Sequence, residues 1–283
     1  MRNKLQLLVC CHKFDKNIRT NYPYLPIQVG KDLHPDLDLG FINDNQGDNI
    51  SAKNSGWNEL TAIYWGWKNI NNVDYLGLCH YRRYFDVDWD KLSIDDYMKD
   101  CDIVTVQNII GYEMNMNRTG LISSVSQEDF YIYLDTMITI HPEHKQKIID
   151  YFYNYNKFVP FNMFVASKEI FDSYCKFIFP VLNAVEAKIK PHSYSRLKRV
   201  IGYMGEWSLG VFILCYGLRV KEVPYILCDD VNYMSPIKYG KVDILKWRLK
   251  TWKKTLGHKV ENVPVPDDVR IALKNDGIIL ESI

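Results

Sequence analysis

Two adjacent arginines carry the clearest chemical signal in the chain. The segment 75–79 is a short apolar run of strand length, and His80, Tyr81, Arg82 and Arg83 follow it directly. Guanidinium groups bind phosphate oxygens through paired N–H groups, so this cationic cluster suits a diphosphate. Ligands of open α/β sheets bind beyond the carboxyl ends of the strands, which predicts an anion site here. The alternative is that the two arginines form ion pairs with carboxylates on the protein surface.

A lone acidic residue is the second candidate for chemistry. The segment 200–216 is almost entirely apolar, and Glu206 is its one acidic residue. Burial of an unpaired carboxylate is costly and raises its pKa, which suits a group that accepts a proton from a hydroxyl. An ion pair with Arg199 or Arg82 is an equally good explanation.

Metal binding has one candidate motif. Asp86 and Asp88 form an Asp-x-Asp pair, with Asp90 beyond it, and carboxylates at alternate positions can bind Mg²⁺ or Mn²⁺. Arginines rather than an apolar strand precede the motif, and short acidic repeats are common on protein surfaces. We therefore favour a site without a metal. The seven cysteines contain no CxxC pair and are expected to be buried thiols in a reducing cytosol.

Two elements should position the cationic cluster. The continuous apolar run 5–11 predicts a buried strand of a parallel sheet, which ends at His12 and Lys13. A polar loop, 48–55, precedes a segment with apolar residues at helical spacing. Glu59 lies in the first turn of that predicted helix, where a carboxylate suits the helix dipole.

The rest of the pattern predicts an α/β fold. Further strands are expected at 27–29, 103–106, 158–166 and 218–227, and helices at 93–99, 126–140, 142–155 and 168–188. Segments 31–48 and 111–124 are predicted to be irregular, and 263–283 to be a short tail or a final strand.

Composition excludes several classes of function. The 283 residues include 35 basic and 34 acidic side chains, so nucleic acid is not expected as a partner. No apolar run is long enough to span a bilayer, and the N-terminus does not read as a signal peptide.

The C-terminal part differs in composition. Residues 238–259 place Leu and Trp at helical spacing among many lysines, which is typical of a helix lying in an anionic membrane surface. A helix that docks on its own domain is the alternative. We expect a domain at 1–235, a basic amphipathic extension at 236–283, and a cytoplasmic protein that is peripheral on the inner face of the bacterial membrane.

Several long blocks resemble a bacterial glycosyltransferase family of capsule and lipopolysaccharide gene clusters, long catalogued as a domain of unknown function. The blocks lie between Leu5 and Cys228 and read PIQVG, NISAKN, ELTAIYWGWKN, GLCHYRRYF, NMFVASKEIFDSYCKFIF and RVIGYMGEWSLGVF. The resemblance implies a GT-A-like α/β fold with a mostly parallel sheet flanked by helices. It also implies transfer of a sugar, such as galactofuranose or another hexose, from a UDP-sugar to a growing capsular polysaccharide or lipopolysaccharide. A general base that acts opposite the leaving group would invert the anomeric carbon.

The resemblance also assigns roles to residues. Donor-binding positions would be His12, Lys13, Asn49, Ser51, Asn54, Glu59, His80, Tyr81, Arg82 and Arg83. Acceptor-binding positions would be His141, Asn162 and Trp207. Glu206 would be the general base, while Arg82 and Arg83 stabilise the leaving diphosphate in place of the metal that most GT-A enzymes use. A divalent metal on Asp86 and Asp88 is the alternative.

Two other classes of protein stay open. A sugar-binding module of an envelope-assembly complex would keep the aromatic and cationic surfaces without turnover. A nucleotidyltransferase would also use phosphate-facing arginines, but the sequence has neither a GxxxxGK[ST] nor a GxGxxG phosphate loop.

Overall fold

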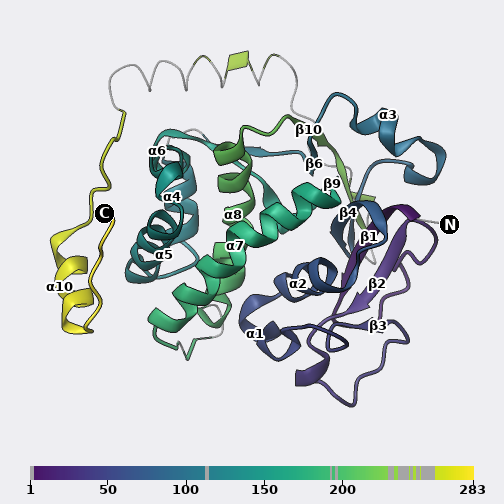
Figure 1. The fold of residues 1–283 in the computed structure, drawn as a ribbon, viewed down its shortest axis with the longest axis horizontal. Coiled ribbons are helices and arrows are strands. Elements are labelled where there is room, and N and C mark those ends of the chain that lie inside the picture. Colours follow the sequence, from purple (N-terminus) through teal and green to yellow (C-terminus); the bar gives the residue numbers. More distant parts are fainter. Residues whose placement is uncertain are drawn as a thin grey trace. The chain divides into compact units, whose positions relative to one another are not determined.

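The chain divides into two compact units (Figure 1). The computed structural model describes residues 3–111, 115–191, 193–194, 197–228, 233–234, 242, 245–246, 249 and 259–283. Unit 1 comprises Met1–Asn108, Val159–Lys176 and Leu218–Ile237. Unit 2 comprises Ile109–Phe158, Phe177–Gly217 and Lys238–Ile283.

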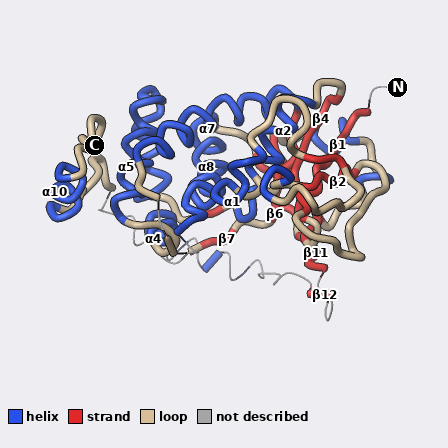
Figure 2. The backbone as a smooth tube through the Cα atoms, turned by 90° about the horizontal axis from the view of Figure 1, so that it is seen from below, coloured by secondary structure: helices blue, strands red, loops and turns tan. Residues whose placement is uncertain are grey.

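Unit 1 is built on a sheet, whose strands are red in Figure 2. All but one strand of its main path run parallel. In spatial order the strands are β10 (Val220–Val223), β6 (Ile103–Val106), β9 (Phe164–Ser167), β4 (Val73–His80), β1 (Asn3–Cys11), β2 (Tyr24–Gln28) and β3 (Ile42–Asn43). The exception is β9, which is antiparallel to both β4 and β6. The long apolar strands β1 and β4 are therefore central and paired on both sides, which explains their continuous apolar sequence.

A small antiparallel extension leaves the sheet at the end of β4. His80 pairs with Arg83, so β4 turns through two residues into β5 (Arg83–Phe85). Strand β5 pairs with β11 (Tyr225–Cys228), which pairs with β12 (Tyr233–Met234). The prediction of one strand at 218–227 was wrong, because Pro224 separates β10 from β11 and cannot donate to a ladder.

The helices of unit 1 are short and pack closely on the sheet. They are α1 (Asn54–Trp57), α2 (Leu60–Asn69), α3 (Ile94–Met98), the start of α7 (Lys168–Lys188), and the 3₁₀ turns η1 (Lys31–Leu33), η2 (Ser51–Lys53), η3 (Trp89–Lys91) and η6 (Pro160–Asn162). A Cβ atom on Gly66 would lie 2.6 Å from Leu8, so glycine lets α2 approach β1. Ser93 caps α3 through the Asp96 amide, as its sequence predicted.

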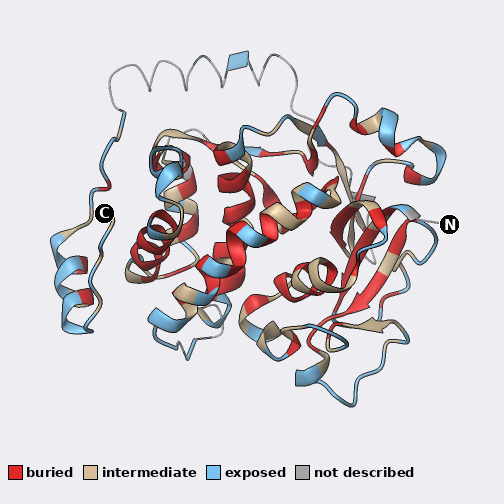
Figure 3. Cartoon of the chain, viewed as in Figure 1, coloured by how far each residue is buried: buried red, intermediate tan, exposed pale blue. Residues whose placement is uncertain are grey.

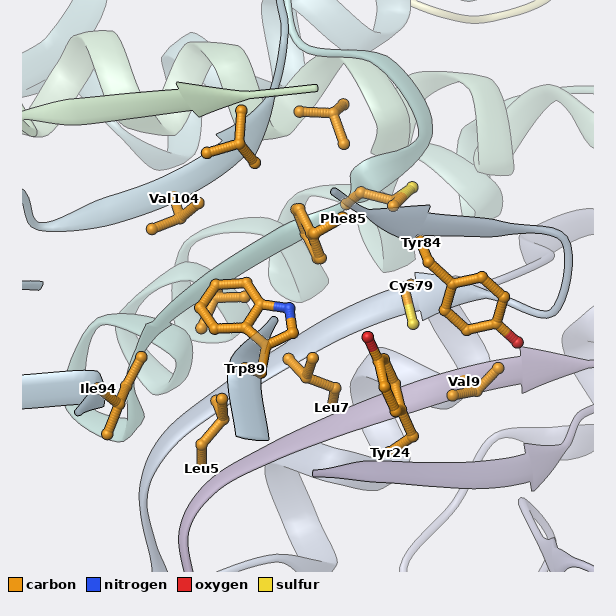
Figure 4. Close-up of a cluster of buried hydrophobic side chains, with 14 of the residues drawn as sticks. Leu5, Leu7, Val9, Tyr24, Cys79, Tyr84, Phe85, Trp89, Ile94 and Val104 are labelled. Atoms are coloured by element: carbon orange, nitrogen blue, oxygen red, sulfur yellow. The ribbon is translucent and has the colours of Figure 1, made fainter. Parts of the chain in front are cut away.

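Apolar side chains fill the space beneath the sheet of unit 1. One buried cluster contains Leu7 and Val9 of β1, Cys79 of β4, Phe85 of β5 and the indole of Trp89 (Figure 4). All of these side chains are buried. The central strands of unit 1 are coloured mostly as buried in Figure 3. Each fully buried large apolar side chain contributes roughly 1.5–3 kcal/mol to folding, so this cluster stabilises the frame on which the loops beyond the strands rest.

Unit 2 is mainly helical. It contains α4 (Met116–Ile122), α5 (Gln127–Ile140), η4 (Pro142–His144), α6 (Lys145–Ile149), the π-helical turn η5 (Asp150–Asn154), the remainder of α7, η7 (Leu197–Arg199), α8 (Val200–Tyr216), α10 (Asp267–Asn275), and a two-stranded ladder of β7 (Ile109–Ile110) with β8 (Lys157–Phe158). Helix α5 begins at its predicted cap, where Ser126 accepts a hydrogen bond from the Asp129 amide.

Three further predicted segments were wrong. Residues 111–124 contain helix α4 rather than only irregular chain, and 263–283 contain helix α10 rather than a strand. The predicted strand 158–166 is broken by η6, where Phe161 and Asn162 adopt positive φ.

The predicted basic helix, 238–259, falls mostly outside the described residues. Within it, Val242, Leu245, Lys246 and Leu249 are helical and exposed. The predicted domain boundary at 235 also falls outside the described part, so it stays a prediction. Among the described helices, none has the length and apolar character needed to span a bilayer.

Candidate functional site

The carboxyl ends of β1 and β4 bring together two segments of the predicted site. Cys10 and His80 are partners in the parallel ladder, and the amide of Tyr81 donates to the Cys10 carbonyl at 3.2 Å. The loop after β1 and the hairpin after β4 therefore leave the same edge of the sheet. The rings of His12 and Tyr81 meet edge to face, 5.1 Å apart. Lys13 is exposed next to them.

Arg82 is held by a carboxylate that the sequence did not single out. Its Nε donates to Oδ2 of Asp15 at 2.8 Å, and the Asp15 side chain is only 5% exposed. Burial alone would raise the pKa of Asp15, but hydrogen bonds from the Asn17 amide and from Arg82 outweigh it and lower the pKa. Asp15 stays ionised and fixes the inner edge of the guanidinium. The signal in the sequence was a carboxylate just after the first strand.

Arg83 has a different environment. Its guanidinium carbon lies 4.5 Å from the centroid of the Phe161 ring. Within the described part of the chain, no carboxylate is paired with Arg83. No described side chain therefore neutralises the charge of Arg83, and this charge is suited to attract an anion.

His80 does not add to the positive charge of the cluster. Burial lowers the pKa of its imidazole to about 4; the hydrogen bond to Phe161 opposes this, and the neighbouring Arg83 lowers the pKa further. His80 is thus neutral at pH 7, and because a carbonyl only accepts, its Nε2 donates to the Phe161 oxygen at 2.7 Å. The expected cationic cluster consists of Arg82 and Arg83, with His80 as a neutral anchor.

Glu59 and Asn162 meet each other. Asn162 is fully buried, and its Nδ2 donates to Oε1 of Glu59 at 2.9 Å. The hydroxyl of Tyr174 donates to Oδ1 of Asn162 at 3.3 Å. None of the Asn162 surface is exposed, and the acceptor-binding role expected for it stays a prediction.

The NISAKN segment builds the loop before α1. Ser51 is fully buried and donates to the carboxylate of Asp44, which also accepts from the Gly30 amide at 2.9 Å. Asn54 donates to the Asn58 carbonyl at 2.8 Å, and Asn49 donates to the Gly47 carbonyl at 2.9 Å. The buried contacts of Ser51 are those of a loop scaffold rather than of a direct donor contact.

The acidic motif after β5 lies on the surface. Asp86 and Asp88 are exposed, and Asp88 pairs with Lys91 at 3.0 Å. In the described residues, no group of three His, Cys, Asp or Glu side chains is placed to hold a metal ion. The expectation that activity needs no divalent metal stays a prediction.

The remaining predicted residues belong to unit 2. Glu206 is half-buried on α8. Trp207 is 7% exposed and stacks on Phe158 at 4.0 Å, while His141 stacks on Phe177 at 4.1 Å. Both aromatic side chains take part in the packing of unit 2, a feature that their sequence context did not predict.

Comparison with solved structures shows the fold. The chain resembles the apo structure of the bifunctional glycosyltransferase WbbM, with a TM-score of 0.71 and 24% identity over 83% of this chain and 48% of that one. It thus spans about half the length of WbbM. The predicted GT-A-like α/β fold, a mostly parallel sheet flanked by helices, is confirmed.

The other comparisons add less. Core-mannan synthase A from Aspergillus fumigatus, solved with Mn and GDP, matches at a TM-score of 0.36 and 12% identity over 91% of this chain and 86% of that one. A TM-score this low carries no inference about this chain. No curated protein matches the sequence. The model of a family described as a domain of unknown function (DUF4422) matches residues 6–216, and the chain belongs to this family.

Proposed function

We propose that the chain is a glycosyltransferase that moves a sugar from a UDP-sugar to a growing capsular polysaccharide or lipopolysaccharide. The observation that carries the proposal is the pair Arg82 and Arg83 on the β4–β5 hairpin, beside the end of β1, in a fold like that of WbbM. Galactofuranose or another hexose is the proposed sugar, on the strength of the family resemblance alone.

The first chemical task is to stabilise the departing diphosphate. Asp15 holds Arg82 through Nε, and the guanidinium of Arg82 lies at the end of the sheet where phosphate oxygens would bind. Arg83 adds a second charge from the adjacent strand. Preorganised cations of this kind lower the energy of a developing anion without a metal.

The second task is to remove a proton from the acceptor hydroxyl. We assign it to Glu206 on α8 as the general base, and direct displacement assisted by such a base inverts the anomeric carbon. Glu206→Gln should lower kcat by about 100-fold or more. Turnover close to that of the unchanged chain would remove the assignment.

The membrane part of the proposal rests on sequence. Residues 238–259, which fall mostly outside the described residues, would hold the protein on an anionic membrane surface. Such a location would place the enzyme near a lipid-linked glycan acceptor.

The test is a panel of UDP-, GDP- and dTDP-sugars, with donor hydrolysis measured without acceptor. Hydrolysis of a UDP-sugar, reduced by Arg82→Met and by Arg83→Met, is the expected result. Arg219→Met is the matched control, because Arg219 pairs with Asp102 elsewhere in unit 1 and is 61% exposed. No binding or hydrolysis across the panel would favour a non-catalytic sugar-binding module.

A further inference from the structure

The turn before β9 is strained. Phe161 has a φ of 70° and Asn162 a φ of 52°, both in the left-handed region. Asparagine tolerates this region, but a phenylalanine there is a rare outlier, and such a residue costs of order 1–3 kcal/mol. Among the described residues, the third non-glycine residue with positive φ is Asn58, directly before Glu59. Among the described residues, non-glycine residues with positive φ thus occur in two segments, and the hydrogen bond from Asn162 to Glu59 joins these segments.

Buried hydrogen bonds hold this turn. The amide of Asn162 bonds to Glu59, which precedes α2, and to Tyr174 of α7, and none of the Asn162 surface is exposed. Loss of one partner from such a network leaves the others unsatisfied, so the geometry is over-determined. This is the condition under which a strained backbone persists.

Phe161 contacts the two residues that flank the β4–β5 turn, His80 and Arg83. Its carbonyl accepts from His80, and its ring faces the Arg83 guanidinium at 4.5 Å. On another side the ring meets Tyr225 edge to face at 5.4 Å. A guanidinium that lies over an aromatic face is attracted to the ring and keeps N–H groups with which it can bind an anion.

We propose that Asn162 is a positioning residue, which holds Phe161 beneath Arg83 so that this guanidinium meets the diphosphate of the donor in a fixed orientation. The inference rests on the proposed function, because it specifies how the same site grips its ligand. It also gives Asn162 a role that its complete burial allows. Arg83 has no described carboxylate to fix it, unlike Arg82, so the ring supplies the constraint.

The experiment is a double-mutant cycle on UDP affinity, measured by calorimetry on the full chain. Phe161→Leu should weaken UDP binding about fivefold, as expected for loss of one cation–π contact. In the Arg83→Met background the same substitution should change the affinity less than about twofold, because Phe161 acts through Arg83. Phe161→Tyr keeps the ring and should restore the affinity.

Asn162→Ala tests the other end of the network. It should weaken UDP binding in the same Arg83-dependent manner as Phe161→Leu. Phe164→Leu is the control for lost aromatic packing, since Phe164 stacks on Phe171 and not on an arginine. It should lower the unfolding midpoint and leave UDP affinity unchanged. If Asn162→Ala does not fold, the cycle on Phe161 decides alone.

The outcomes separate the two claims. UDP binding that is weakened by Arg83→Met and unaffected by Phe161→Leu would overturn the inference and leave the proposed function standing. An equal effect of Phe161→Leu with and without Arg83 would also overturn it, because that is the behaviour of a merely structural residue. If the chain without substitutions does not bind UDP, both the proposed function and the inference are wrong.

Discussion

The neutral state of His80 makes the protein sensitive to acid. The imidazole of an unfolded chain has a pKa of about 6.5, whereas that of His80 in the folded chain is about 4. Between these values the unfolded state binds more protons, so the free energy of unfolding falls as the pH drops. The contribution is fully present above about pH 6.5 and is lost as the pH falls toward 4.

The size of the effect follows from the two pKa values. Their difference corresponds to about 3 kcal/mol at most, and about 2 kcal/mol of it is lost between about pH 7.5 and pH 5. The physical cause is that a cation next to Arg83 in a desolvated position is unfavourable. For the same reason, His80 adds no positive charge to the proposed diphosphate site at pH 7.

The assay is urea unfolding of the unchanged chain and of His80→Gln at both pH values. Glutamine can still donate to the Phe161 carbonyl but does not titrate. On acidification, the free energy of unfolding of His80→Gln should therefore fall by about 2 kcal/mol less than that of the unchanged chain. His34→Gln, at an exposed position, is the control and should behave as the unchanged chain does. Equal acid sensitivity of the unchanged chain and His80→Gln, or a His80 pKa near 6.5 by NMR, would refute the reasoning.

Three other predictions concern the site. Arg82→Lys keeps the charge but loses the forked N–H groups, so UDP binding should weaken about tenfold, and an unchanged affinity in calorimetry would mean that a point charge suffices. Ser51→Ala leaves the buried Asp44 short of a donor and should destabilise the chain by roughly 1–3 kcal/mol in urea, with UDP affinity unchanged; weaker UDP binding at full stability would instead make Ser51 a ligand contact. Donor hydrolysis should persist in EDTA, and complete loss with full rescue by Mn²⁺ would replace the arginine-only mechanism.

The parts of the fold that were predictable have local causes. Strand β6 matches its predicted range, and α7 begins and ends where its pattern predicts. The arginine pair was found because two charges after an apolar strand stand out in a sequence. Ser126 and Ser93 marked their helices because a capping hydroxyl acts within four residues.

The rest depends on contacts distant in sequence. Nothing local shows that Asp15 binds Arg82, 67 residues later, or that His80 bonds to the Phe161 carbonyl, 81 residues later. The break in the predicted strand 158–166 falls at the turn of Phe161 and Asn162, where Asn162 bonds to Glu59, 103 residues away in sequence. A local apolar pattern does not show such a contact. In each case the structure depends on which distant residue a side chain contacts, and the type of the residue alone does not show this.

The most direct test is the position of UDP in a crystal of the protein soaked with that nucleotide. We expect the diphosphate in contact with the guanidinium groups of Arg82 and Arg83, next to the loop that carries His12 and Asp15. A well-ordered UDP bound away from both arginines would contradict the account.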